Sequence, residues 1–279
     1  MGKQRKSDYL FDKNNWETVC LRIVSSDKIA LFLDFDGTLV PIQEDPSRCV
    51  LAEGIKEQLK SLADSGRCYI TILSGRSLPD IKGMVGIPNI SYGGNHGIVI
   101  SGHDMTYVHT KALKAKPSVD KAARMLNKEI AGIEGAWIER KKFTACLHYR
   151  SVRKEDVLSV KKAFYKVASE FSGDSGLAVI RGKMVLELAP DVSWTKGSAA
   201  LWILHNLKGE YLPVYAGDDR TDETAFKALC KIGITIRVGK SKKTVADYDL
   251  KGYWEVSRLL QRMHESILKL ISKQTPAPI

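Results

Sequence analysis

The chain has 279 residues, of which 44% are hydrophobic and 27% charged, and its formal net charge is +11. This length fits one large domain or two modest ones, and the composition is that of a globular chain with a substantial core. No apolar run approaches the length of a membrane span, and no apolar signal-peptide region follows the charged start MGKQRKSDYL. We therefore expect a protein that has no membrane partner.

The cysteines indicate the redox environment. There are five of them, an odd number, and no two form a CxxC pair: Cys20, Cys49, Cys68, Cys146 and Cys230. Scattered single cysteines favour reduced thiols and a cytoplasmic location, and they argue against structural zinc.

The positive charge is concentrated in short runs, namely Lys3–Lys6, Lys111–Lys116, Arg140–Lys142, Lys161–Lys162 and Lys240–Lys243. A nucleic-acid-binding protein can have such runs. However, no zinc-finger, RNP or heptad pattern accompanies them, so we favour solvated faces and a positive field that attracts small anionic substrates. We expect no nucleic-acid partner, and the sequence does not indicate an oligomeric state.

The first hundred residues alternate helices and short apolar strands. The expected elements are a helix at 13–26, a strand at 28–34, a helix at 53–65, a strand at 68–73, a short helix and a strand near 90–93. Such alternation predicts a parallel sheet with helices on both faces.

The middle of the chain has a different pattern. Its expected elements are a helix at 118–130, strands at 135–140 and 143–149, a helix at 154–171, and strands at 177–181 and 184–188. Strand pairs separated by turn-like breaks predict an antiparallel sheet, and here two helices cover one of its faces.

After Pro190 the alternating pattern returns, with a helix at 196–206, a strand at 212–216, a helix at 221–230, a strand at 233–236 and a long helix near 254–272. We therefore predict a Rossmann-like α/β core of residues 1–102 and 190–279. An α+β domain of residues 103–189 interrupts it, with a hinge near 102 and 190.

Polar residues follow the strands of the predicted core. Asp34 ends one strand and Asp36 comes just beyond it, Ser74 and Asp218 follow two others, and Lys196 begins a helix. Ligands of open parallel sheets bind at the carboxyl ends of the strands, so these groups are expected to converge. Any one acid there is usually a helix cap, but that explanation is weak for the whole set.

Clustered carboxylates without His or Cys suit Mg²⁺, which also pairs with substrate phosphate. A carboxylate can attack phosphorus, and a second acid two residues further on can protonate the leaving oxygen and later activate water. A metal ion and Lys196 can offset the charge of the transferring phosphoryl group. These residue types therefore point to phosphoryl transfer.

The motifs DFDGT at 34–38, Ser74, Lys196 and GDD at 217–219 resemble, in order, those of the haloacid dehalogenase superfamily. This resemblance implies a haloacid dehalogenase fold with an inserted cap. It also implies that Asp34 is the nucleophile, that Asp36 is the acid and base, and that Ser74 and Lys196 hold the phosphoryl group. The implied metal ligands are Asp34, Asp36 through its main-chain carbonyl, and Asp218.

A narrower set of segments is similar to the trehalose-6-phosphate phosphatase family: LDFDGTLVPI, LSGRS, GNHG and GDDRTDETAF. In the predicted insertion, the likeness comprises Glu139, Lys141, the tripeptide His148-Tyr149-Arg150 and the run from Gly182 to Pro190, with Ala189 where the family usually has Arg. The resemblance implies a phosphatase of trehalose 6-phosphate.

The implied substrate contacts are Gly75, Arg76, His96, Glu139, Lys141, Arg150, Lys183 and Glu187. Asp219 and Asp222 are expected to support the metal ion and Lys196. Taken singly, the charged cap residues fit a solvated sheet face, and His96 fits a locally hydrogen-bonded turn. Asp222 also fits a helix start, where an acid interacts favourably with the helix dipole.

Three other functions remain open from the sequence. A related phosphatase of sucrose, glucosylglycerol or mannosylglycerate phosphate would share the core and differ in the cap. A sugar phosphomutase shares the two acids but has a Gly-Asn-Asp ending that is absent after Gly217. The third hypothesis, a non-catalytic protein that binds nucleic acid or sugar phosphate, is supported by the net charge alone.

Overall fold

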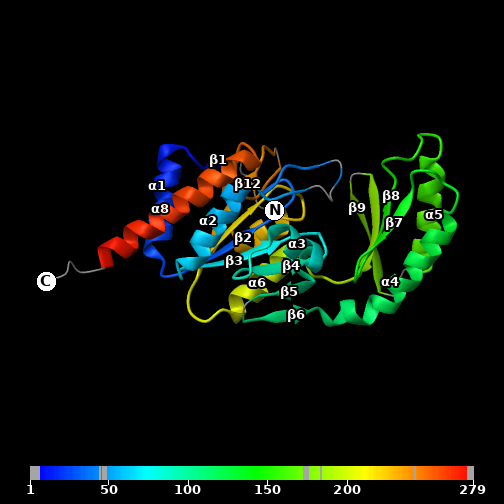
Figure 1. The fold of residues 1–279 in the computed structure, drawn as a ribbon, viewed down its shortest axis with the longest axis horizontal. Coiled ribbons are helices and arrows are strands. Elements are labelled where there is room, and N and C mark those ends of the chain that lie inside the picture. The colour runs from blue at the N-terminus through cyan, green and yellow to red at the C-terminus, as the bar shows by residue number, and fades with distance from the viewer. Residues whose placement is uncertain are drawn as a thin grey trace. The chain divides into compact units, whose positions relative to one another are not determined.

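The computed structural model describes residues 7–43, 45, 49–102, 104–171, 176–182, 184–241 and 243–274 (Figure 1). The predicted substrate contact Lys183 and the basic run Lys3–Lys6 lie outside the described residues. The chain divides into two compact units, Met1–Tyr107 with Trp194–Ile279, and Val108–Ser193. Among the described residues, no helix combines the length and the apolar character that crossing a membrane requires.

The first unit contains a nine-stranded sheet. Its strand order is β1 (Asp8–Tyr9), β13 (Tyr248–Leu250), β12 (Ile234–Val238), β11 (Leu212–Gly217), β2 (Ile29–Leu33), β3 (Cys68–Leu73), β4 (Ser91–Gly94), β5 (Val99–Ser101) and β6 (Thr106–Val108). All pairings from β1 to β4 are parallel, and β5 runs antiparallel to β4. The central strand β2 therefore has β11 on one side and β3 on the other.

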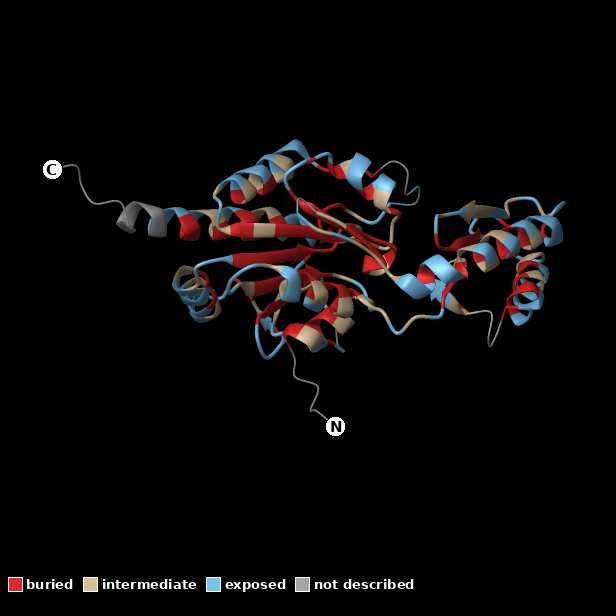
Figure 2. Cartoon of the chain, turned by 90° about the horizontal axis from the view of Figure 1, so that it is seen from below, coloured by how far each residue is buried: buried red, intermediate tan, exposed pale blue. Residues whose placement is uncertain are grey.

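Helices cover both faces of this sheet, as predicted. The helices on one face are α1 (Lys13–Ser25), α2 (Glu53–Asp64), α3 (Leu78–Val85) and α8 (Val256–Gln274), and those on the other are α6 (Lys196–Asn206) and α7 (Glu223–Leu229). Successive residues of β2 alternate between the two faces, so Leu31 and Leu33 join one apolar cluster and Phe32 the other. Figure 2 shows the resulting buried strands between partly exposed helices.

The second unit is an antiparallel sheet in the order β7 (Trp137–Arg140), β8 (Ala145–His148), β10 (Val185–Pro190) and β9 (Leu177–Gly182). The helices α4 (Thr110–Glu129) and α5 (Val157–Ser169) lie on one side of it (Figure 1). Leu147 and Leu186 point toward these helices and are buried with Val119 and Phe164. The alternate residues of the same strands lie on the other face of the sheet.

The structure corrects one helix boundary and adds four strands. Helix α4 begins at Thr110 and not at 118, because the buried positions Ala112, Ala115 and Val119 continue one apolar stripe past Pro117. The strands β1, β5, β6 and β13 were not predicted, since each has only two or three residues and too short a pattern to show a period.

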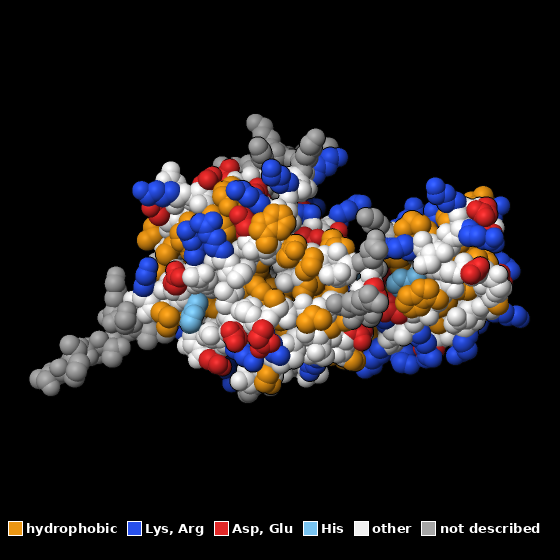
Figure 3. Space-filling model, turned by 45° about the horizontal axis from the view of Figure 1, so that its top comes forward, with side chains coloured by type: hydrophobic (Ala, Val, Ile, Leu, Met, Phe, Trp, Pro, Cys, Tyr) orange, Lys and Arg blue, Asp and Glu red, His pale blue; other side chains and the backbone are white. Residues whose placement is uncertain are grey.

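The basic side chains are spread over the surface. On the face drawn in Figure 3, Lys and Arg occur in small groups among acidic and apolar side chains. Several are engaged with acids, such as Lys116 with Asp120 at 2.9 Å and Lys166 with Glu129 at 2.8 Å.

Candidate active site

The carboxylate of Asp34 lies at the carboxyl end of β2 in the middle of the large sheet. Its main-chain N–H donates to the carbonyl oxygen of Ala216 at 3.0 Å, which continues the pairing of β2 with β11. The residue is only 5% exposed. A charged group at this depth needs partners, because burial without them strongly disfavours the ionised form.

Lys196 is the cationic partner of Asp34. It is the first residue of α6, whose start is fixed by reciprocal capping bonds between Thr195 and Ser198. Its Nζ donates to Oδ1 of Asp34 at 2.6 Å and to Oδ1 of Asp222 at 2.7 Å, and the residue is 2% exposed. The helix start therefore places one buried ammonium between two buried carboxylates.

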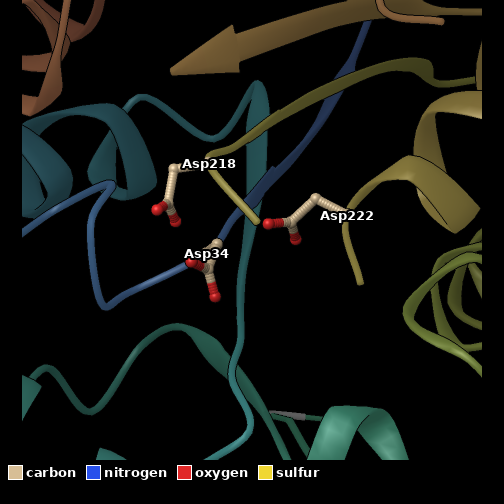
Figure 4. A group of neighbouring side chains, drawn as sticks. All are labelled: Asp34, Asp218 and Asp222. Carbon is tan, nitrogen blue, oxygen red and sulfur yellow. The ribbon is translucent and has the colours of Figure 1, made fainter. Parts of the chain in front are cut away.

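Asp218 completes a cluster of three acids. One carboxylate oxygen from each of Asp34, Asp218 and Asp222 lies within 4.8 Å of the other two. Figure 4 shows Asp34, which follows β2, beside Asp218 and Asp222, which both come from the segment between β11 and α7. The close approach of Asp218 depends on Gly37, which has a φ of +87°. A Cβ added to Gly37 would lie 2.2 Å from Oδ2 of Asp218, so only glycine fits there.

The charges in this cluster do not balance. Burial raises the pKa of Asp34 well above its usual range against the opposing effect of Lys196, and burial also raises the pKa of Asp218. Burial would lower the pKa of Lys196, but Asp222 and Asp34 hold it above its usual value. One ammonium thus faces three carboxylates, a surplus of negative charge that a divalent cation would offset.

The two oxygens of Asp222 are already occupied. Oδ1 accepts from Lys196 and from the hydroxyl of Tyr215 at 2.8 Å, and Oδ2 accepts from the N–H of Asp219 at 2.9 Å. Asp222 therefore orients Lys196, which leaves Asp34 and Asp218 as the carboxylates that could bind a cation. The side chain of Asp219 is exposed, and its main chain makes the contact.

Ser74, Gly75 and His96 lie together at the end of β3. Ser74 is buried, and its carbonyl oxygen accepts from the N–H of His96 at 2.9 Å. Gly75 faces the ring of His96, where an added Cβ would lie 2.7 Å from the ring carbon Cε1. His96 forms a local turn beside the predicted phosphoryl site. This geometry fits both expectations for the residue, namely a substrate contact and a locally hydrogen-bonded turn.

Asp36 and Arg76 form a pair of their own. The guanidinium of Arg76 donates from Nε to Oδ2 of Asp36 at 2.7 Å and from Nη2 to Oδ1 at 2.5 Å. The carboxylate of Asp36 is not among the three that cluster, so only its main chain remains as a proposed metal contact.

In the second unit, four of the expected substrate contacts lie on β7, β8 and β10 or just beyond them. In the register of the sheet, Cys146 on β8 lies opposite Glu139 on β7 and opposite Glu187 on β10. The three side chains therefore share the sheet face that points away from α4 and α5. Glu139 accepts through Oε2 from Nε2 of the His148 ring at 2.8 Å, and Nζ of Lys141 lies 3.8 Å from the same oxygen. The fourth, Arg150, is exposed just after β8.

The sequence analysis missed two aromatic residues that contact expected site residues or their neighbours. Tyr215 was not selected because a tyrosine in a buried strand is usually core, yet its hydroxyl holds Asp222. Trp137 stacks on His148 with ring centroids 4.1 Å apart, and alternation along β7 would have placed it on the face of Glu139.

Comparison with known proteins gives consistent results. The sequence profile of a family described as trehalose-phosphatase matches residues 32–253. A probable trehalose-phosphate phosphatase D of Arabidopsis thaliana is 36% identical over 255 residues, which are 85% of this chain and 68% of that protein. A trehalose-phosphate phosphatase of Mycobacterium tuberculosis H37Rv is 39% identical over 214 residues, which are 75% of this chain, and the chain spans about half, 53%, of that relative.

Solved structures support the fold. A trehalose-6-phosphate phosphatase related protein gives a TM-score of 0.74 at 24% identity, covering 88% of this chain and 100% of that chain. The C-terminal domain of the Candida albicans trehalose-6-phosphate phosphatase gives 0.77 at 21% identity, covering 95% and 99%. A haloacid dehalogenase-like hydrolase from Bacteroides thetaiotaomicron gives 0.60 at 15% identity, covering 85% and 99%, so the predicted haloacid dehalogenase fold is confirmed.

Proposed function

Because the chain belongs to the trehalose-phosphatase family and is a phosphomonoester hydrolase, we propose that it hydrolyses trehalose 6-phosphate to trehalose and phosphate. The family and the enzyme class expected from the sequence are confirmed. The observation that carries the proposal is the family match over residues 32–253, which includes the buried Asp34 and Lys196 and the half-buried Asp218. A cytoplasmic location remains part of the proposal.

The residues present fit a magnesium ion. The cluster offers only oxygen donors, its carboxylates exceed its cations, and the pKa values of Asp34 and Asp218 are raised by burial. Asp34, Asp218 and the main-chain carbonyl of Asp36 would hold the ion. When bound, it would neutralise charge on the carboxylates and on the phosphate of the substrate.

In the first half-reaction, a carboxylate oxygen of Asp34 attacks phosphorus. A bond forms between this oxygen and phosphorus, and the bond from phosphorus to the sugar oxygen breaks. Asp36 gives a proton to the departing sugar oxygen, so that trehalose leaves as a neutral alcohol. Lys196 and the hydroxyl of Ser74 stabilise the charge on the transferring phosphoryl oxygens.

In the second half-reaction, water attacks the phosphorylated Asp34. Asp36, now a carboxylate, takes a proton from the water molecule while the oxygen of that water forms its bond to phosphorus. The bond from phosphorus to the Asp34 oxygen breaks, which releases phosphate and restores both acids to their starting forms. The fixed position of Lys196 between Asp34 and Asp222 keeps a positive charge at this centre in both steps.

The second unit supplies the proposed sugar contacts. Glu139, Lys141 and Glu187 share one sheet face, and their charged groups suit the hydroxyls of a disaccharide. Arg150 stays in the proposal as an exposed donor. Gly75 and His96 would border the phosphate from the core.

The test is phosphate release from a panel of sugar phosphates. Trehalose 6-phosphate, sucrose phosphate, glucosylglycerol phosphate and mannosylglycerate phosphate are compared with Mg²⁺ and with a chelator. We expect turnover of trehalose 6-phosphate that stops with chelator and resumes on adding Mg²⁺. Preference for another member of the panel, or turnover in chelator, would contradict the proposed substrate or the proposed cofactor.

A first prediction concerns the nucleophile. Asp34→Asn keeps the size of the side chain and an oxygen that accepts from Lys196, but it removes the attacking carboxylate. We expect kcat to fall by at least about 1,000-fold, with an unchanged circular dichroism spectrum. Ordinary turnover by the folded variant would exclude Asp34 as the nucleophile.

A further inference from the structure

The ion pair between Arg76 and Asp36 has a geometry suited to orientation. Two parallel bonds, at 2.7 and 2.5 Å, join a planar guanidinium to a planar carboxylate and fix both the position and the plane of the acid. The Arg76 side chain is 12% exposed and the Asp36 side chain 37%. The arginine is therefore the embedded partner, and the carboxylate is the accessible one.

Other contacts hold Arg76 independently of Asp36. Its N–H donates to the hydroxyl of Ser74 at 3.1 Å, and its carbonyl oxygen accepts from the N–H of Asn95 at 2.8 Å. Its guanidinium carbon lies 5.5 Å from the ring centre of the fully buried Phe35. The chain before it is equally confined, because Gly75 has no room for a Cβ beside His96.

We propose that Arg76 is a positioning residue for Asp36 and acts on the reaction through that carboxylate, in place of the substrate contact expected from the sequence. The inference rests on the proposed function, in which Asp36 transfers the proton to and from the reacting oxygens. An arginine is never deprotonated, so it contributes no proton of its own. Its contribution is the direction in which the Asp36 carboxylate faces.

The test uses aryl phosphates whose leaving groups differ in basicity. Phenyl phosphate needs a proton on its departing oxygen, whereas 4-nitrophenolate departs readily without one. For Arg76→Gln we expect kcat/KM to fall about 100-fold on phenyl phosphate and much less on 4-nitrophenyl phosphate. Arg76→Lys keeps the charge but lacks the paired donors, so we expect it to recover only part of the loss.

A double-mutant cycle separates positioning from substrate binding. If Arg76 acts through Asp36, adding Arg76→Gln to Asp36→Asn lowers kcat/KM no further, because the group that it orients is already absent. If Arg76 binds the phosphate directly, the losses add, KM rises, and both aryl esters suffer equally. Any one of these three results would overturn the inference.

Lys82→Gln serves as the matched control. Lys82 is an exposed cation that donates to the hydroxyl of Ser101 and lies outside the proposed machinery, so its loss should leave both aryl activities unchanged. Circular dichroism and Tm verify folding, and if Arg76→Gln does not fold, Arg76→Lys with Asp36→Asn completes the cycle. Aryl esters contain no sugar, so the test does not depend on the natural substrate. If Arg76→Gln lost more activity on phenyl phosphate than on 4-nitrophenyl phosphate but the enzyme did not hydrolyse trehalose 6-phosphate, only the proposed substrate would be contradicted.

Discussion

At the residue scale, the carboxylates of Asp34 and Asp218 suit a bound cation, but their burial destabilises the folded protein when no metal is bound. Burial raises the pKa of Asp218 above its ordinary value of 3.8, so the folded protein favours the protonated form more than the unfolded chain does. The contribution of this group to stability is therefore complete below pH 3.8. It is lost as the pH rises through the raised pKa.

The second prediction follows from this sign. In chelator, Asp218→Asn should have a higher Tm than the wild type at neutral pH, since its amide has no charge to bury, and the difference should vanish as the pH falls toward 3.8. Adding Mg²⁺ should raise the Tm of the wild type and not that of the variant. Melting curves across pH measure this, and Asp27→Asn, at an exposed acid away from the cluster, is the control. A wild type that melts above Asp218→Asn in chelator at neutral pH would contradict it.

The third prediction concerns the hydroxyl of Tyr215. Burial raises its pKa well above the usual value, and the negative charge of Asp222 adds to this, so the group stays protonated and donates to Asp222. Removing it in Tyr215→Phe leaves a buried carboxylate with one donor fewer and should cost about 1.5–3 kcal/mol of stability. Urea unfolding gives the value, with Tyr211→Phe, at a half-buried tyrosine just before the same strand, as the reference. Equal effects of the two changes would show that Tyr215 does not support Asp222.

At the element scale, close packing of two helices fixes the position of Lys196. Helices α6 and α7 meet at Gly197, where an added Cβ would lie 2.3 Å from the carbonyl oxygen of Thr224. Because that neighbour is main chain, it cannot rotate away. The first turn of α6 would have to move, and it carries the lysine that holds Asp34.

The fourth prediction tests this contact. Gly197→Ala should destabilise the protein by about 1–3 kcal/mol and lower kcat by about 100-fold through displacement of Lys196. Gly54→Ala in α2 is the control, because nothing lies within 4 Å of its added Cβ. That change should raise stability by about 0.4–1 kcal/mol and leave kcat unchanged. Normal activity of Gly197→Ala would mean that α6 tolerates the methyl group without moving Lys196.

The long elements were predictable from the sequence because their patterns are strong. The runs at β2, β3 and β11 are buried and mostly apolar, with Thr71 as a polar residue inside β3. The polar residues that follow these runs had to meet at one edge of a parallel sheet. The pairing of Asp36 with Arg76 was not predictable, because it joins two turns whose relative placement no local pattern encodes. The edge strands escaped detection for a related reason, since their pairing is set by neighbours distant in the chain.

At the scale of the whole molecule, the second unit has a hydrophobic core of its own. The two residues of the first unit between which it is inserted, Tyr107 and Trp194, lie side by side. The apolar cluster of the second unit is formed within residues 115–188, by Val119, Phe164 and Leu186 among others. The rings of Tyr107 and Trp194 stack with centroids 4.9 Å apart. The indole N–H of Trp194 also donates to the carbonyl oxygen of Gly97 at 2.9 Å.

The fifth prediction is that residues 108–193 can be replaced by a short Gly–Ser linker between Tyr107 and Trp194. The deletion removes a complete cluster and leaves the nine-stranded sheet nearly whole, so the shortened protein should fold and keep hydrolysing 4-nitrophenyl phosphate. Its kcat/KM for trehalose 6-phosphate should fall about 100-fold, because the sugar contacts that orient the substrate are lost. Steady-state kinetics on both esters, with circular dichroism as the check on folding, decide the matter. If the shortened protein retained full activity on the sugar phosphate, substrate choice would reside in the core, and the charged face of β7, β8 and β10 would be only a solvated surface.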